Sequence, residues 1–414
     1  MLPVETPTLS VATMALPDTG SLDSLLRSTD PAAPLAWLRG GEGFVGVGEA
    51  VRWEFSGASR FDDAAEAWRA LSARSTIDDP LHLPGTGLVA FGSFAFSPTS
   101  STLSTLIVPR IIFGRRGGRA WLTRITVVGE TPAGSPALAE PGTAPAIRFT
   151  PGRMAESAYS AAVAQAVREI EAGRVEKVVL ARDLRGELPT SFDLRTPLER
   201  LATSYPDCWT FAVDGLIGSS PEMLVRVDSG TVQARVLAGS SARGVDAASD
   251  SAAALALVTS DKDHDEHGFA LRSVLAALTP HTSSLAASDV PFALKLPNLW
   301  HLASDVEGVL SDRSSSLDLL RSLHPTAAVA GTPTAVATAT IDELEPFDRG
   351  RYAGPVGWLS ANGDGEWAIA LRCAQVDGDT ITAYAGAGVV AGSEPERELA
   401  ETAMKFRPIV EAFG

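Results

Sequence analysis

Two carboxylates and one amine are spaced to share one face of the helix that we expect over about residues 396–413. Glu398 and Glu401 are three residues apart, and Lys405 follows four residues later. Side chains at these spacings lie above one another on a helix. Carboxylate oxygens are ligands that Mg²⁺ prefers, and an amine attracts an anion. Taken alone, the pattern fits a solvent-exposed helix with a Glu–Lys pair at least as well.

The strand that precedes this helix contains glycines at short intervals. Gly386 and Gly388 alternate with alanines, Gly392 follows them, and Gly378 lies just upstream. Glycine lets a bound molecule or another chain segment approach the backbone closely, because it has no side chain. The strand and the helix together are therefore a candidate ligand site.

Lys177 is a second candidate, in the expected strand Val175–Leu184. Its neighbours on the same face of the strand are Val175 and Val179. An amine held among apolar side chains is disfavoured in its charged form, so it can serve as a base near neutral pH. A lysine on the solvent face of an edge strand is the plainer explanation when the residue is considered alone.

A carboxyl group follows a Ser-Ser-Pro turn at Glu222, in the sequence GSSPE (218–222). Partial burial would keep such a group protonated, so that it could donate a proton, although capping of a turn is a common alternative. Further along, LAGSSARG (237–244) offers backbone N–H groups to a carboxylate or phosphate, but it lacks the P-loop pattern.

Acids and histidines are dense in DKDHDEH (261–267), at the expected start of a helix. The two histidines, His264 and His267, are three residues apart, which is not the i, i+4 spacing of a helical zinc pair, and no HExxH sequence is present. An acidic first turn that is favoured by the helix dipole explains the segment without a metal.

The composition restricts the class of protein. The chain has 414 residues, 45% of them hydrophobic, and a net charge of −16, which argues against nucleic acid or an anionic membrane as a partner. Its only cysteines, Cys208 and Cys373, have no metal-ligand spacing. We find no signal peptide and no apolar run of membrane-spanning length, and we expect a cytoplasmic protein.

The pattern of elements predicts an α+β fold. We expect an irregular lead-in over residues 1–35, a hairpin over 43–55, a helix near 61–72, strands on both sides of GRRGG (114–118), and a linker over 129–153. Later strands, near 209–217, 223–227, 356–359, 366–376 and 380–385, are joined mostly by short turns. Short connections favour antiparallel pairing over a doubly wound parallel sheet.

Nine ordered segments together resemble the chorismate-utilising enzymes, and among them most closely the isochorismate synthases. They are KVVLAR (177–182), SPEMLVR (220–226), LAGSSARG (237–244), DKDHDEH (261–267), LPNLWHL (296–302), LHPTAAVAGTP (323–333), ELEPFDRGRYAGPVGW (343–358), GEWAIALRCA (365–374) and YAGAGVVAGSEPERELAETAMKF (384–406). The resemblance covers about residues 154–414. It implies the aminodeoxychorismate synthase-like fold, with two packed, mainly antiparallel sheets between helical layers, in which residues 151–414 form the catalytic region and residues 1–150 a variable half of the same sandwich.

The resemblance also implies a Mg²⁺-dependent reaction on chorismate. Lys177 matches the general base that activates water for attack at ring C2, and Glu222 matches the acid that protonates the departing C4 hydroxyl. Glu266 and Glu401 match the Mg²⁺ ligands, with Glu398 beside them.

The remaining matches are groups that bind the substrate. They are Gly239 and Ser240 for the ring carboxylate; Tyr352 and Arg372 for the enolpyruvyl carboxylate, with Gly386 and Lys405 nearby; and His301, Ala328 and Leu371 lining the site. A base and an acid are both needed, because water is a poor nucleophile and hydroxide a poor leaving group. Mg²⁺, Arg372 and Lys405 would balance the two negative charges of the substrate.

The sequence also bears on the alternative functions within and outside this family. Lys177 favours a water-adding enzyme over anthranilate or aminodeoxychorismate synthase component I, so we expect no glutaminase subunit. Ala328 favours isochorismate synthase over salicylate synthase, in which a polar threonine is usual. A catalytically inactive relative would have lost Lys177 or Glu222, and a divalent-metal hydrolase would need more clustered ligands. We expect a monomer that supplies menaquinone biosynthesis, with siderophore biosynthesis as the alternative.

Overall fold

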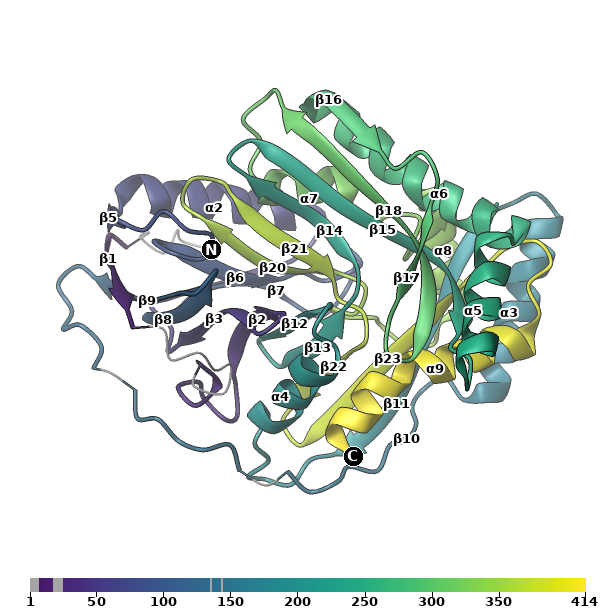
Figure 1. The fold of residues 1–414 in the computed structure, drawn as a ribbon, viewed down its shortest axis with the longest axis horizontal. Helices are drawn as coiled ribbons and strands as arrows, with labels where there is room; N and C mark the ends of the chain where they lie inside the picture. Colours follow the sequence, from purple (N-terminus) through teal and green to yellow (C-terminus); the bar gives the residue numbers. More distant parts are fainter. Residues whose placement is uncertain (1–6, 18–24, 135, 143) are drawn as a thin grey trace.

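The computed structural model describes residues 7–17, 25–134, 136–142 and 144–414. In this part of the chain, two large sheets pack face to face with helices on their outer sides (Figure 1). Pairing is antiparallel throughout, except that β1 and β5 are parallel. The α+β class and the two mainly antiparallel sheets are thus as predicted.

The first sheet, sheet A, contains the strand that carries Lys177. Its order is β10 (Thr150–Pro151), β11 (Lys177–Glu187), β23 (Thr380–Val389), β22 (Cys373–Asp377), β13 (Leu216–Ser220), β12 (Trp209–Val213), β2 (Leu35–Arg39), β3 (Glu42–Val47), β8 (Ile111–Arg116), β9 (Arg119–Val127), β1 (Leu9–Leu16) and β5 (Thr76–Asp78), with β19 (Gly331–Thr332) beside β11.

The second sheet, sheet B, lies across the core from sheet A. Its order is β16 (Thr282–Ala287), β18 (Leu299–Leu310), β15 (Thr231–Ala242), β14 (Met223–Asp228), β21 (Gly365–Ile369), β20 (Pro355–Ser360), β6 (Val89–Ser93), β7 (Ser104–Val108) and β4 (Val51–Phe55), with β17 (Phe292–Lys295) beside β18. Both sheets combine strands from before and after residue 150.

Helices cover the outer faces of both sheets. Against sheet A pack α3 (Glu156–Glu171), α4 (Arg195–Ser204), α8 (Thr334–Leu344) and α9 (Pro395–Phe413). Against sheet B pack α2 (Arg60–Arg74), α5 (Ala247–Val258), α6 (Asp261–Leu278) and α7 (Ser316–Leu323), and a 3₁₀ turn, η1 (Thr279–His281), follows α6. Figure 1 shows α2, α7 and α6 along the upper side and α4 and α9 along the lower side. Where the chain is described, its helices are too short or too polar to cross a lipid bilayer.

The helices form because their apolar residues recur at helical spacing. In α3, Tyr159, Val163, Ala166 and Ile170 are buried, and Gly173, just after the helix, has a φ of +71°, a conformation that glycine adopts readily. Buried side chains from both sheets form the main core, and a second cluster lies between sheet A and helices α4 and α9. The predicted linker runs from β9 to β10 along the lower edge of the molecule (Figure 1).

Two local predictions from the sequence are wrong. The expected hairpin over residues 43–55 does not form, because β3 pairs with β8 in sheet A and β4 pairs with β7 in sheet B. The lead-in over residues 1–35 is not irregular throughout, because Leu9–Leu16 is an eight-residue strand. Its alternate residues Leu9 and Val11 are buried in the core, which is the period-two pattern of a strand with one face covered. Residues 1–6 and 18–24 of the lead-in lie outside the described residues.

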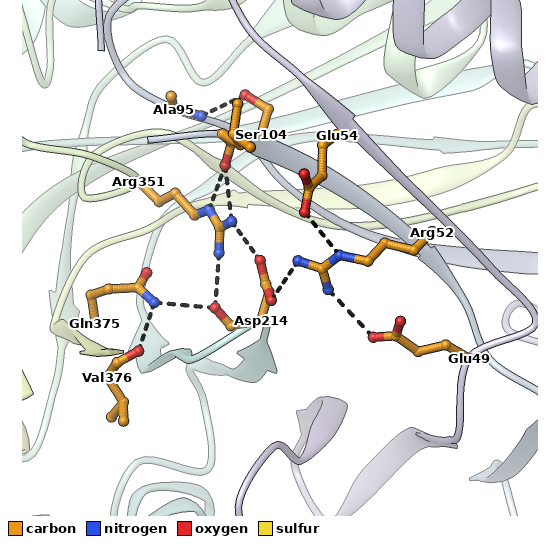
Figure 2. A network of polar contacts seen from close by, with 10 residues as sticks. Glu49, Arg52, Glu54, Ala95, Ser104, Asp214, Arg351, Gln375 and Val376 are labelled. Carbon is orange, nitrogen blue, oxygen red and sulfur yellow. Dashed lines mark hydrogen bonds and ion pairs between the residues drawn. The ribbon is translucent and has the colours of Figure 1, made fainter. Parts of the chain in front are cut away.

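A polar network around Asp214 ties the two sheets together at one end (Figure 2). Asp214 lies in the turn between β12 and β13, and its side chain accepts a hydrogen bond of 2.8 Å from Arg52 of β4. Arg351 donates to the carbonyl oxygens of Asp214 and Leu103 at 2.8 and 3.0 Å, and Gln375 of β22 also donates to Asp214. Burial acts to raise the pKa of Asp214, but the two arginines hold it below its usual value. The network therefore anchors the segment that leads from Arg351 to the candidate site.

Candidate active site

A cavity is bordered by β11 and β23 of sheet A and by β15 and β18 of sheet B. Side chains and backbone from ten segments reach its wall. The lining residues are Val179, Pro221, Glu222, Leu237, Ala238, Gly239, Ser240, Glu266, His301, Ala328, Val329, Tyr352, Ala353, Leu371, Arg372, Gly386, Gly388 and Lys405. All the site residues expected from the sequence line this cavity, except Lys177, Glu398 and Glu401.

Lys177 lies immediately behind this wall. Its side chain is fully buried, and Nζ is 3.2 Å from Oε1 of Glu266, a lining residue. Nζ has no hydrogen-bond partner among the described residues. A Cβ atom added at Gly388 would lie 3.1 Å from Cε of Lys177 and 2.2 Å from Oε1 of Glu266. The absence of a side chain at Gly388 therefore allows the amine and the carboxylate to meet at the cavity wall.

Glu222 lies in the short connection between β13 and β14, and only 5% of its surface is exposed. Burial raises the pKa of Glu222 to about 7, and this effect is partly offset by the backbone N–H of Leu237 and by the charges of Lys177, Arg372 and Lys405. The carboxyl group is therefore protonated in a large fraction of molecules at neutral pH, as a proton donor requires. Glu222 lines the same cavity behind whose wall Lys177 lies.

His301 and Arg372 form a buried pair on another wall of the cavity. Burial, with the nearby charges of Arg372 and Lys405, lowers the pKa of His301 far enough to keep the ring neutral. Nδ1 lies 3.2 Å from the carbonyl oxygen of Gly239, which can only accept, so Nδ1 carries the hydrogen. Nε2 then accepts a hydrogen bond of 3.0 Å from Nη2 of Arg372. The histidine thus fixes the orientation of a guanidinium that can bind a carboxylate.

Arg372 and Lys405 reach the cavity from different elements. Arg372 has a φ of +48°, at the point where the chain leaves β21 of sheet B and enters β22 of sheet A. Lys405, on α9, donates a hydrogen bond of 2.9 Å to the carbonyl oxygen of Gly386, and its Nζ is 2.5 Å from Glu401. Both cations suit a substrate with negative charges.

Tyr352 lines the cavity beside β23. Its hydroxyl oxygen would lie 2.9 Å from a Cβ atom at Gly386, and its ring stacks on Tyr384 with 5.2 Å between the centroids. Burial raises the pKa of Tyr352 above its usual value, so the phenol stays protonated and can donate a hydrogen bond. A small residue is therefore needed at position 386.

The three carboxylates expected to bind metal, Glu266, Glu401 and Glu398, do not converge on one point. Glu266 faces Lys177, Glu401 pairs with Lys405, and Glu398 is buried with 2% of its surface exposed. No three His, Cys, Asp or Glu side chains of the described residues converge to hold a metal ion. The chemistry of the donors nevertheless fits Mg²⁺, because all are carboxylates, and Gly388 leaves space beside the oxygen of Glu266.

Several lining residues were not among the residues expected from the sequence. They are Val179, Pro221, Leu237, Ala238, Val329, Ala353 and Gly388. Most are sequence neighbours of expected residues, and Gly388 was visible as part of the alternation of small residues in AYAGAGVV. Ala353 has a φ of +61°, a conformation that its residue type does not reveal.

The comparison with known families agrees with this site. A family model described as "Chorismate binding enzyme" matches residues 37–414. The chain therefore belongs to the chorismate-binding enzyme family, and the resemblance seen in the ordered motifs is confirmed.

Within the chorismate-binding enzymes, the similar proteins are isochorismate synthases. Isochorismate synthase DhbC of Bacillus subtilis is 41% identical over 268 residues, which are 62% of this chain and 67% of that protein. Isochorismate synthase EntC of Escherichia coli K12 is 36% identical over 264 residues, covering 63% of this chain and 68% of that protein.

Solved structures show the same fold over nearly the whole chain. A putative 2,3-dihydroxybenzoate-specific isochorismate synthase, DhbC from Bacillus anthracis, has a TM-score of 0.79 at 32% identity and covers 95% of this chain and 99% of its own. MenF, the menaquinone-specific isochorismate synthase from Escherichia coli, has a TM-score of 0.79 at 26% identity and covers 99% of this chain and 95% of its own. The predicted fold class is confirmed.

Proposed function

We propose that this protein is an isochorismate synthase, which converts chorismate to isochorismate. The observation that carries the proposal is one cavity bordered by the Lys177–Glu266 pair and by Glu222, a carboxyl group with a pKa of about 7. A base and an acid at one cavity are what the exchange of one hydroxyl group for another requires.

In the proposed reaction, the amine of Lys177 removes a proton from water as the water oxygen forms a bond to ring C2. The ring double bond shifts, the C4–O bond breaks, and Glu222 gives its proton to the leaving hydroxyl, which departs as water. Proton exchange with solvent restores both groups. One water is consumed and one is released, so the product is an isomer of the substrate.

Charged groups around the cavity would bind and orient the substrate. The guanidinium of Arg372, held by His301, suits one carboxylate of the substrate. The phenol of Tyr352 lines the same cavity and can donate a hydrogen bond to that carboxylate. The backbone at Gly239 and Ser240 borders the cavity and suits the other carboxylate. Bidentate contact from an arginine fixes orientation as well as charge.

Mg²⁺ is part of the proposal. We infer that Glu266 and Glu401 would hold it, with Glu398 beside them, and that it would neutralise the ring carboxylate of the substrate when bound. The other residues of the site bind substrate or transfer protons as described above.

We further propose that a single chain is sufficient for activity, as a monomer in the cytoplasm without a glutaminase subunit. Both cysteines are buried and unpaired, which suits a reducing compartment. The similar proteins include menaquinone-specific and 2,3-dihydroxybenzoate-specific enzymes, so we propose the reaction and not one pathway. Light scattering of the purified protein tests the monomer.

Product analysis tests the function. The purified protein is incubated with chorismate and Mg²⁺, and the products are identified by mass and absorbance. We expect isochorismate, no reaction in EDTA, and chorismate when isochorismate is supplied instead. Salicylate plus pyruvate as the main products would overturn the assignment.

A further inference from the structure

Strand β11, which begins at Lys177, has a gap in its pairing on one side. On its other side β11 pairs with β23 from Val178 to Glu187. On the side with the gap, β19 pairs only with Lys177 and Val178, and β10 pairs only with Leu184 and Arg185. The backbone of Val179–Asp183 therefore needs partners other than a neighbouring strand.

The backbone of Ala330 and Gly152 supplies two of these partners, to the N–H of Val179 and the carbonyl oxygen of Asp183, and two side chains supply two others. The N–H of Ala181 donates a hydrogen bond of 2.7 Å to Oε1 of Glu345, and the carbonyl oxygen of Val179 accepts one of 2.7 Å from Nη2 of Arg349. Glu345 thus offers a hydrogen-bond acceptor to β11 and Arg349 offers a donor, as the backbone of a neighbouring strand would do. Both follow the end of α8.

The two side chains are also paired with each other. Oε1 and Oε2 of Glu345 accept hydrogen bonds of 2.5 and 2.8 Å from Nη2 and Nε of Arg349. Their side chains are 1% and 3% exposed. An ion pair so deeply buried adds little net stability, because removing both charges from water offsets their attraction. The hydrogen bonds of the pair to the backbone of β11 indicate a role in holding that strand in place.

Arg349 also bonds to a second segment that lines the cavity. Its Nη1 donates a hydrogen bond of 2.8 Å to the carbonyl oxygen of Val329, and Val329 and Ala328 line the cavity. Its guanidinium lies 4.5 Å from the ring centre of Phe96, which limits its movement. One guanidinium therefore connects the strand of Lys177 to the loop that holds Ala328.

We propose that the Glu345–Arg349 pair is a positioning element for the reaction, which sets where Lys177 stands relative to the loop of Ala328 and Val329. The inference rests on the proposed function, because it assigns the pair to the placement of the base. Neither residue touches the substrate cavity itself. A displacement of the base by about 1 Å can reduce a rate roughly 100-fold.

The conservative substitution Arg349→Lys tests the proposal. A lysine keeps the charge, but cannot bond to Val179, Val329 and both oxygens of Glu345 with the planar geometry of arginine. We expect kcat to fall roughly 10- to 100-fold and KM for chorismate to stay within about 2-fold. The matched control is Arg195→Lys, because Arg195 forms a buried ion pair with Asp193 outside the cavity, with side-chain exposures of 4% and 8%. We expect the control to lower the melting temperature and leave kcat unchanged.

A double variant separates positioning from loss of the fold. Glu345→Leu with Arg349→Met replaces the ion pair by apolar side chains of similar size, which buried sites often tolerate. We expect it to fold, to lose kcat to at least the same degree, and to exchange the amide hydrogen of Ala181 at least about 10-fold faster than the wild type. That exchange is measured by NMR and does not depend on activity.

The outcomes are distinguishable. Wild-type kcat in both Arg349→Lys and the double variant would overturn the proposal, as would an effect on KM alone or an equal loss in Arg195→Lys. Failure of the wild-type protein to form isochorismate would overturn the proposed function instead. The exchange of Ala181 would then still report whether the pair holds β11.

Discussion

The Nζ atom of Lys177 lies 3.2 Å from Oε1 of Glu266, although one residue begins a strand of sheet A and the other lies on a helix outside sheet B. Gly388 makes this approach possible, since any side chain there would collide with the carboxylate. The amine is thereby held at the cavity wall without a hydrogen bond of its own among the described residues. This contact relates the base and the expected metal site to each other.

Replacement of Lys177 by alanine should abolish turnover while chorismate still binds. The residue lies behind the lining of the cavity and is proposed to activate water, so it contributes little to anchoring the substrate. We expect kcat to fall by a factor on the order of 10³, within the usual range for a general base, and Kd for chorismate to change only a few-fold. Lys295→Ala, on strand β17, is the matched control and should keep full activity. A Lys177→Ala enzyme with near wild-type kcat would show that another group is the base.

Glu222 should give the enzyme an alkaline limit of activity near pH 7. Burial raises its pKa from the usual 4.5 to about 7, and only the protonated form can donate, so activity should fall as the pH rises above about 7. The variant Glu222→Gln should lose roughly 10²- to 10⁴-fold in kcat and should lack this limit. A pH–rate profile of both proteins is the measurement, and an unchanged limit in the variant would assign it to another group.

The carboxyl group of Glu222 should lower the stability of the folded protein as the pH rises. The unfolded chain releases the proton near pH 4.5 and the folded protein only near pH 7, so the folded state is progressively disfavoured as the pH rises through this range. The difference corresponds to about 3 kcal/mol in the free energy of unfolding. Glu222→Gln should therefore gain stability relative to the wild type between pH 5 and pH 8, as measured by urea unfolding.

A methyl group at Gly388 should separate the amine from the carboxylate. In Gly388→Ala the new Cβ would lie 2.2 Å from Oε1 of Glu266 and 3.1 Å from Cε of Lys177, so the glutamate must move. We expect kcat to fall at least about 10-fold, since a shift of this size misplaces the base. Gly134→Ala, which has open space around it, is the control for the same change and should behave as the wild type. Full activity of Gly388→Ala would mean that the pair is not needed in its present arrangement.

Much of the fold could be predicted from the sequence because it depends on local patterns. The helices α2, α6 and α9 were expected from the sequence, and β8 and β9 from the glycine-rich turn between them. The hairpin expected over residues 43–55 failed because alternation of apolar residues shows that a strand is half-buried but not which sheet it joins. There the chain crosses from sheet A to sheet B.

At Arg372 in the site, the sequence again does not show which sheet a strand joins. Residues 366–376 were expected to form one strand, but the chain changes sheets between Ile369 and Cys373. The positive φ of Arg372 at this crossing is uncommon for a residue with a side chain, and only the packing of the two sheets determines it. Most of the expected residues still line one cavity, because they were identified from ordered motifs and not from predicted elements.

Glu401→Ala should weaken the binding of Mg²⁺ and of chorismate together. The variant removes a proposed ligand and also the partner of Lys405, whose Nζ lies 2.5 Å from Glu401, so the amine is free to take up a different position at the cavity. We expect the Mg²⁺ concentration for half-maximal rate and KM for chorismate each to rise roughly 10-fold or more, since metal sites commonly lose 10- to 100-fold in affinity even when an outer partner is removed. The measurement is a titration of rate with Mg²⁺ at several chorismate concentrations. Glu411→Ala on the same helix removes a carboxylate that pairs with the exposed Arg407 and should change neither constant. If Glu401→Ala raised KM with an unchanged requirement for Mg²⁺, the glutamate would act only through Lys405, and the metal would have to be held by other carboxylates.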